Sequence, residues 1–238
     1  MSLTGIHPVV EALKSGRAIE RILVARGAGG ARVQELIDLA RERSIPVRFE
    51  DRGVLDRLAS SAAHQGVVAL AASHRYGDFE TAVENAELVV VLDGVEDPHN
   101  LGAIVRTAHA AGAGAVVIPE RRAAGLTETV AKAAAGALEH IPVTRVANVN
   151  RTIEDMKKRG IWIYGLDERG TQDHDRIEYA TPTAFVFGAE GKGLHEQVKK
   201  HCDALVRIPL AGKIPSLNVS VAVGVVLFEW RRRRRLKA

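Results

Sequence analysis

The pattern of apolar and polar positions divides the chain into alternating helices and strands. In the N-terminal part, charged residues cover one face of a helical repeat whose apolar positions are Val33, Leu36, Ile37 and Ala40. Further helices are predicted at 7–16 and 51–62, and strands at 19–25, 46–49 and 67–72. These elements predict a small α/β domain of a size that folds alone only marginally.

Near-continuous apolar runs dominate the rest of the chain and alternate with helical segments. The runs lie at 88–93, 115–119, 142–146, 161–166, 184–188 and 205–208. Strands that are apolar throughout indicate a parallel sheet covered by helices on both faces. Because ligands of such sheets bind at the carboxyl ends of the strands, we expect the functional site at that edge.

A polar stretch, SHRYGDFE at 73–80, interrupts the pattern between these two parts. Polar residues and a glycine between periodic segments are typical of a domain boundary. We therefore predict one domain at 1–72, a linker at 73–82 and a second domain at 83–238.

Composition narrows the class of protein. The 238 residues are 46% hydrophobic and 26% charged, as in ordinary globular proteins. The single cysteine, Cys202, excludes an internal disulfide and leaves no cysteine cluster for zinc. No N-terminal signal pattern appears, and the apolar run near 221–228 is too short to span a bilayer. We expect a soluble, cytoplasmic protein without a metal or a membrane partner.

Positive charge is concentrated at the two ends of the chain. The net charge is +4, but Arg231 to Arg235 and Lys237 supply six positive charges, which leaves 1–230 with a net charge of −2. The first 75 residues carry a net charge of +3 and residues 76–230 a net charge of −5. Both basic ends suit contact with a phosphate backbone, although a solvated arginine tail is an equally simple interpretation.

Three segments place polar residues or glycines where the predicted strands end. The first, DGVEDPHNLGAIVRTAHAAG at 93–112, carries Asn100 just ahead of a predicted helix and Arg106 in its second turn. The second, FGAEGKGL at 187–194, has three glycines that let a ligand approach the backbone. The third, at 208–230, presents Ser216 and Asn218 before an apolar helix.

Simpler interpretations of these segments stay open at this level. Asn100 and Ser216 are good helix caps, and Arg106 could be a solvated helix residue. The glycine segment does not match the Walker phosphate loop, because Leu194 stands where Ser or Thr is required, and no Rossmann fingerprint follows the first strands. A nucleoside triphosphate or a dinucleotide is therefore disfavoured as the ligand.

Taken together, the three segments closely resemble the signature motifs of the SpoU (TrmH) family, ribose 2′-O-methyltransferases of the SPOUT superfamily. The N-terminal GIHPVVEAL and HQGVVA resemble the L30e-like domain of bacterial family members that methylate a guanosine of 23S rRNA. The resemblance covers nearly the whole chain. It implies a parallel-sheet catalytic domain with a C-terminal trefoil knot, a homodimer, S-adenosylmethionine as cofactor and 23S rRNA as partner.

The resemblance also implies site residues. The polar set of the family is matched by Asn100, Arg106, Glu190, Ser216 and Asn218. The backbone groups that hold S-adenosylmethionine fall at Gly188, Ile208 and Leu217.

Simple chemistry suggests how such a set could work. Methyl transfer to a ribose requires the 2′-oxygen to be held near the methyl group while its proton leaves. An arginine pKa lies above about 12, so we expect Arg106 to stabilise the developing alkoxide and not to act as the base. A phosphate oxygen or water would take the proton. Asn100 and Asn218 could fix the ribose or orient Arg106, Glu190 could pair with Arg106, and Ser216 could contact substrate.

Candidate RNA contacts lie in the N-terminal domain. Arg17, Arg21 and His64 are the predicted contacts, with Arg26 and Arg32 able to extend the patch, since RNA recognition relies on groups that bind phosphates and 2′-hydroxyls. For each arginine alone a solvated surface is the default, and His64 also suits a structural role in its turn. The alternatives to the whole assignment are methylation of another rRNA or tRNA nucleotide and, less favoured, a non-catalytic RNA-binding protein of the same fold.

Overall fold

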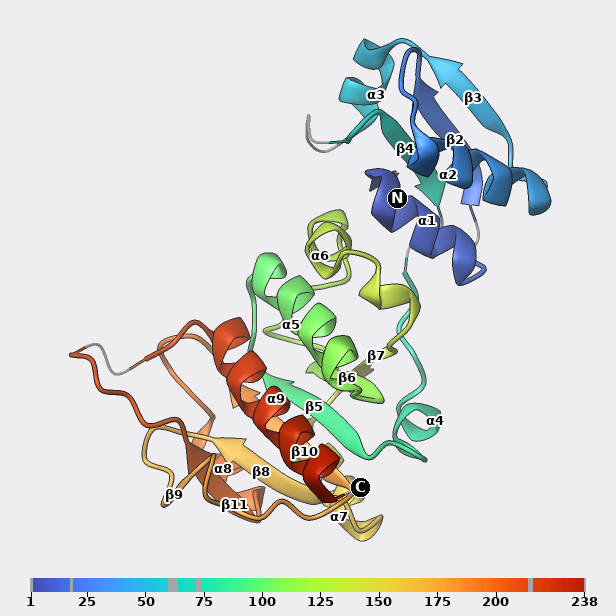
Figure 1. The fold of residues 1–238 in the computed structure, drawn as a ribbon. Helices are drawn as coiled ribbons and strands as arrows, with labels where there is room; N and C mark the ends of the chain where they lie inside the picture. Colours follow the sequence, from blue (N-terminus) through green and yellow to red (C-terminus); the bar gives the residue numbers. More distant parts are fainter. Residues whose placement is uncertain (1, 18, 60–63, 72–73, 214–215, 238) are drawn as a thin grey trace. The chain divides into compact units, whose positions relative to one another are not determined.

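The computed structural model describes residues 2–17, 19–59, 64–71, 74–213 and 216–237 (Figure 1). The chain forms two compact units. The first contains Met1–Arg75 together with Leu126–His140, and the second contains Tyr76–Gly125 and Ile141–Ala238.

The first unit is built on a four-stranded sheet in the order β1-β4-β2-β3. Its strands are β1 (Ser2–Thr4), β2 (Ile19–Ala25), β3 (Val47–Glu50) and β4 (Val67–Ala71), and its helices include α1 (Ile6–Lys14), α2 (Ala31–Glu42) and α3 (Arg52–Leu58). The predicted strands and helices of this part are confirmed within a few residues, and the part of the predicted helix at 60–62 lies outside the described residues. β1 was not predicted, because three residues are too few to show a period.

A segment from the second half of the sequence completes the first unit. α6 (Glu128–Ala134) and the 3₁₀ helix η1 (Ala137–Glu139) pack there, and Ala131 lies in its apolar core. Arg17 and Glu139 form an ion pair of 2.9 Å with side chains only 6% and 8% exposed, and Arg17 also contacts His74. The predicted ranges, 1–72 and 83–238, did not include this exchange, because local periodicity does not report which unit a helix joins.

The second unit contains a seven-stranded sheet in the order β7-β6-β5-β10-β8-β11-β9, and its neighbouring strands pair in parallel. The strands are β5 (Leu88–Asp93), β6 (Ala115–Pro119), β7 (Val143–Val146), β8 (Trp162–Leu166), β9 (Gln172–Asp173), β10 (Thr183–Gly188) and β11 (Ala204–Arg207). The helices are α4 (Phe79–Val83), α5 (Pro98–Ala111), α7 (Val149–Lys158), α8 (Glu196–His201) and α9 (Val219–Lys237). The predicted α/β fold with a parallel sheet is confirmed.

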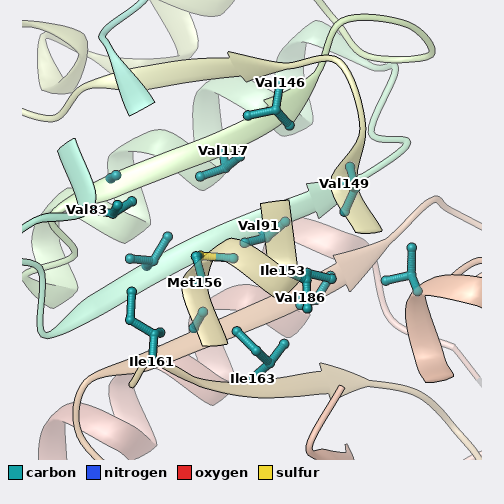
Figure 2. Close-up of a cluster of buried hydrophobic side chains, with 14 of the residues drawn as sticks. Val83, Val91, Val117, Val146, Val149, Ile153, Met156, Ile161, Ile163 and Val186 are labelled. Carbon is teal, nitrogen blue, oxygen red and sulfur yellow. The ribbon is translucent and has the colours of Figure 1, made fainter. Parts of the chain in front are cut away.

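Helices cover both faces of this sheet, as near-continuous apolar strands require. On one face, Val91, Val117 and Val186 pack against Ile153 and Met156 of α7 (Figure 2). Successive residues of a strand point to opposite faces of the sheet, so the residues next to these valines point to the other face. There α5 and α9 lie together across the sheet (Figure 1). The indole of Trp230 in α9 is buried there and its Nε1 donates to Thr183 Oγ1 at 3.2 Å.

Two stretches of the second unit differ from their predictions. α4 begins inside the predicted linker at 73–82, where Asp78 caps it by accepting from Thr81 N at 3.0 Å; residue 73 lies outside the described residues. The arginine run forms the last turns of α9, and Arg232 and Arg233 pair with Glu229 at 2.8 and 2.6 Å. These arginines therefore hold local structure. The trefoil knot stays a prediction.

Within the described part of the chain, no helix combines the length and apolar character needed to cross a membrane.

The Arg17–His74 contact predicts a pH-dependent stability. Burial, and next the Arg17 charge, lower the pKa of His74 from 6.5 to about 4. The unfolded chain binds this proton at higher pH than the folded chain. The free energy of unfolding is therefore fully retained above pH 6.5 and falls by about 2 kcal/mol towards pH 4. Urea titrations across this range should show this part of the loss in wild type and not in His74→Gln, whose stability should fall less.

His99→Gln, which changes an exposed histidine of the second unit, is the matched control and should behave as wild type. The same pH dependence in wild type and His74→Gln would contradict the assignment.

Candidate functional site

The site lies where β5 and β10 end side by side. The two strands pair in parallel with Asp93 opposite Gly188, so that the loops following them leave the sheet at the same level. The first loop leads into α5 and the second into α8. This is the edge predicted for a ligand in a parallel sheet.

A hydrogen-bonded network joins all three of the predicted motifs. Glu190 Oε1 accepts from Asn100 Nδ2 at 2.8 Å and from Asn218 Nδ2 at 3.0 Å. Asn218 Nδ2 also donates to Asn100 Oδ1 at 3.0 Å. The residues are 28 to 118 positions apart in sequence, so this network fixes the loops relative to one another. The expected pairing of Glu190 with Arg106 is not formed: the carboxylate binds the two amides through Oε1, and the side chain of Arg106 lies elsewhere, exposed on α5.

α5 and α9 are capped by residues other than the Asn100 and Ser216 considered in the sequence. The side-chain amide of Asn100 is therefore not used as a cap. Asp97 caps α5 by accepting from the backbone of His99 at 2.6 Å, and Asn100 is the third residue of the helix. The simpler interpretation of Asn100 as a helix cap is therefore wrong, and its side chain is available to the network. Asn218 caps α9 by accepting from Ser220 N at 2.9 Å, so Ser216 is not the cap.

A pocket of about 360 Å³, here called the main pocket, opens between these loops. Its lining includes the predicted cofactor residues Gly188, Ile208 and Leu217, together with Glu190 and Ser216. A separate polar hollow of about 170 Å³ lies on the other side of Glu190, between the 94–97 loop, Asn100 and Lys192. The structure thus brings Asn100, Glu190, Ser216 and Asn218 to one edge.

The main pocket depends on a close backbone approach. A Cβ atom built on Gly188 would lie 2.0 Å from the carbonyl carbon of Gly193, and one on Gly170 would lie 2.5 Å from the carbonyl carbon of Val206. Only glycine fits at either position. The glycine segment was predicted to let a ligand approach the backbone. In the structure, the close approach is between Gly188 and the backbone of Gly193 in the same segment.

Charged residues at the pocket wall were missed in the sequence. Asp167 follows β8 and contacts Lys199 Nζ at 2.8 Å, with both side chains largely buried. Burial opposes ionisation of Asp167, but hydrogen bonds from Lys199 and from the Arg169 backbone outweigh it and lower its pKa. The same contact, with Glu196, raises the pKa of Lys199. The sequence did contain a signal for this residue, because Asp167 directly follows the apolar run at 161–166.

Asp93 makes a similar contact at the end of β5. Its Oδ2 accepts from the backbone N–H of His195 at 2.9 Å and lies 2.8 Å from His195 Nδ1. Asp93 therefore holds the start of α8, and with it the glycine segment, against the sheet. It also follows an apolar strand.

Arg106 is placed apart from the network. It lies on α5 in the third turn, not the second, because the helix begins at Pro98. Its side chain is exposed, is not part of the main pocket, and has no hydrogen bond or ion pair within the described residues. Arg106 is therefore free to meet a group from outside the chain.

Two of the three predicted RNA contacts are buried. His64 is fully buried; its Nδ1 accepts from Gly66 N at 3.0 Å and its Nε2 donates to Asp56 at 2.8 Å. Arg17 is held by Glu139, so both residues stabilise the first unit and their geometry argues against direct RNA contact. Arg21 stays partly exposed, with only a long 3.8 Å contact to Glu20.

The chemistry of the main pocket fits S-adenosylmethionine. Its size suits a small cofactor, and apolar Phe187, Leu210 and Leu217 adjoin the acidic Glu190 and the Asp167–Lys199 pair. Apolar walls suit an adenosine, carboxylates suit sulfonium and ammonium charges, and a lysine suits a carboxylate. No group of three or more metal-binding side chains gathers anywhere in the described ranges.

Comparison with protein families decides the assignment of the second unit. Residues 87–228 match the model of the SpoU rRNA Methylase family. The chain belongs to this family. Residues 2–77 match the model described as RNA 2'-O ribose methyltransferase substrate binding. The first unit is therefore the substrate-binding domain of a SpoU enzyme, and the chain is an RNA methyltransferase that uses S-adenosylmethionine.

Individual relatives agree with the family assignment. YacO of Bacillus subtilis (strain 168), assigned to the TrmH family of tRNA/rRNA methyltransferases, is 44% identical over 97% of this chain and 94% of its own. The AdoMet-bound rRNA methyltransferase from Sinorhizobium meliloti has a TM-score of 0.83 at 29% identity, covering 98% and 87% of the two chains. The TrmH/SpoU tRNA modifying enzyme of A. aeolicus has a TM-score of 0.58 at 30% identity, covering 63% and 77%.

The close approach of Gly188 to Gly193 predicts that a side chain at position 188 prevents cofactor binding. Gly188→Ala should abolish the calorimetric binding of S-adenosylmethionine, because the new Cβ must displace Gly193 and collapse the loop. Gly191→Ala is the control in the same loop: its φ of +72° costs about 1 kcal/mol for a residue with a Cβ, but no atom lies within 4 Å. Gly191→Ala should bind the cofactor. Wild-type affinity in folded Gly188→Ala would refute this account.

Proposed function

We propose that this SpoU enzyme transfers the methyl group of S-adenosylmethionine to the ribose 2′-hydroxyl of a guanosine in 23S rRNA, and that it acts as a homodimer in the cytoplasm. The observation that carries the proposal is the Asn100–Glu190–Asn218 network beside the main pocket. It is a polar, preorganised surface next to a site that fits the cofactor, as a methyl transfer to a hydroxyl requires.

The proposed roles follow from what each side chain offers. Asn100 and Asn218 hold the carboxylate of Glu190, and the three together fix the loops on which the ribose rests. The exposed Ser216 hydroxyl lines the main pocket and contacts substrate. The guanidinium of Arg106 stabilises the oxygen from which the proton leaves and an adjacent phosphate, and a phosphate oxygen or water takes that proton.

A homodimer would bring Arg106 to the site. α9 exposes an apolar stripe at Val221, Val225 and Phe228, and Phe228 is 50% exposed. α9 packs against α5 near Thr107, the residue next to Arg106. A two-fold contact through this stripe would cover it and place Arg106 of one protomer near the main pocket of its partner.

The share of this chain that each relative covers supports rRNA over tRNA as the substrate. The rRNA methyltransferase of Sinorhizobium meliloti matches across 98% of this chain, substrate-binding unit included, whereas the A. aeolicus tRNA modifying enzyme matches across 63%. Guanosine as the base rests on the resemblance of the N-terminal unit alone. Methylation of another rRNA nucleotide or of tRNA is the second candidate.

Mapping 2′-O-methylation in 23S rRNA and tRNA from cells with and without the gene tests substrate and base together. A single guanosine of 23S rRNA that loses its methyl group is the expected result. Loss at a tRNA position would favour the second candidate, and no loss in either RNA would refute both candidates.

Arg106→Ala tests the catalytic assignment. Methyl transfer from tritiated S-adenosylmethionine to 23S rRNA should fall about a hundredfold or more, because a charge-stabilising donor is lost. Cofactor affinity by calorimetry should stay at the wild-type value, since Arg106 does not line the main pocket.

Mixing two inactive variants tests the dimer. Arg106→Ala and Gly188→Ala, refolded together, should recover about a quarter of wild-type activity, because half of the dimers are mixed and each has one intact site. Each variant refolded alone is the control. If the mixture stays as inactive as its components, Arg106 does not act across a two-fold interface.

A further inference from the structure

The loop between β6 and α6 includes ERRAAG at 120–125 and lies at the edge of the sheet that carries the candidate site. It takes no part in the Asn100–Glu190–Asn218 network. It follows β6, which pairs with β5 in parallel at Val117 and Val91. The loop therefore leaves the sheet beside the loop that ends at Asp97, the cap of α5. Figure 1 shows β6 next to β5 within the second unit.

The loop is fixed by backbone contacts on both sides. Ala124 N donates to Val95 O at 3.0 Å, and Glu120 N donates to Val146 O at 2.9 Å. Around Gly94, a Cβ would lie 3.9 Å from the carbonyl oxygen of Arg122 and 3.4 Å from Cβ of Ala189. Three loops thus meet at Gly94, and two of them line the polar hollow beside Asn100 and Glu190.

Two guanidinium groups project from this fixed loop. Arg121 and Arg122 are both exposed, and neither has a hydrogen bond or ion pair with the residues that the structure describes. Elsewhere in the second unit, arginines such as Arg207, Arg232 and Arg233 pair with carboxylates. Two adjacent, unpaired arginines on a rigid support suit an external phosphate, which a guanidinium can bind through two parallel hydrogen bonds.

The backbone of Arg122 is in the left-handed region, with φ of +58°. A residue with a Cβ adopts this conformation at a cost, and glycine or asparagine would adopt it more easily. Folding alone therefore gives no reason for an arginine at this position. A strained residue beside an active site is an observation that points towards function.

We propose that Arg121 and Arg122 form a phosphate clamp for the RNA strand, next to the nucleotide whose 2′-hydroxyl is methylated. This inference rests on the proposed RNA methylation and adds two substrate-binding residues to it. The clamp binds backbone phosphate and so contributes affinity and register without selecting a base. It lies in the second unit and acts with the substrate-binding domain, not in place of it.

Arg122→Gly separates binding from stability. Glycine removes the guanidinium and also relieves the left-handed backbone, so the melting temperature should stay the same or rise. The affinity for in vitro transcribed 23S rRNA, measured without cofactor, should fall about tenfold at low salt. The slope of log affinity against log salt concentration should become shallower by about one unit, as expected for one lost phosphate contact.

Matched variants define the reference. Arg151→Ala removes the same charge from an exposed position on α7 and should keep wild-type affinity and slope. Arg121→Ala combined with Arg122→Gly should change the slope by about two units. Unchanged RNA affinity in Arg122→Gly, or an equal loss in Arg151→Ala, would overturn the clamp.

The binding measurement also distinguishes the two proposals. Wild-type protein that binds 23S rRNA through the clamp yet transfers no methyl group would leave the clamp standing and refute the proposed reaction. Full methyl transfer by Arg122→Gly with wild-type RNA affinity would support the proposed reaction and refute the clamp. Wild-type protein that does not bind 23S rRNA at all would overturn the clamp.

Discussion

The acceptance of two amide donors by one carboxylate oxygen is the interaction on which the site depends. Glu190 Oε1 binds Asn100 at the start of α5 and Asn218 at the cap of α9. α5 and α9 also pack together over one face of the sheet, so the network closes a unit that is already defined by apolar packing. A carboxylate used in this way positions the loops of the site.

Close backbone contact and buried charge shape the main pocket around that network. Gly188 lets the glycine segment fold back against Gly193, and Asp93 ties the far end of the segment to β5. Asp167 and Lys199 place a paired charge in the wall. A paired charge costs less to bury than a lone one, so the pocket can offer polar groups to a cofactor while the sheet beneath it stays apolar.

The arginines of this protein divide into those that fold it and those that face outward. Arg17 pairs with Glu139 of η1 in the first unit, and Arg233 pairs with Glu229 within α9 and donates to the carbonyl oxygen of Ile177. Arg106, Arg121 and Arg122 are exposed and unpaired within the described residues, at or near the catalytic edge. Residues 76–230 carry a net charge of −5, and the six positive charges of 231–237 bring 76–238 to only +1, so we expect the position of a few unpaired cations to matter more for RNA binding than the total charge.

The sequence by itself determined the strands apart from the short β1 and β9, and with them the parallel sheet and the motif residues, because runs such as LVVVLD carry their burial in their own composition. The motifs also singled out Asn100, Glu190, Ser216 and Asn218, which the structure brings to one edge of the sheet. Tertiary structure alone decided that Asn100 is not a cap, that His64 and Arg17 are buried, and that 126–140 joins the first unit. The Arg17–Glu139 pair and the place of 126–140 depend on contacts distant in the chain, which local periodicity does not report. At Asn100 and His64 the partners Asp97 and Asp56 are near in the sequence, but only the folded geometry shows which side chain caps the helix and which is enclosed.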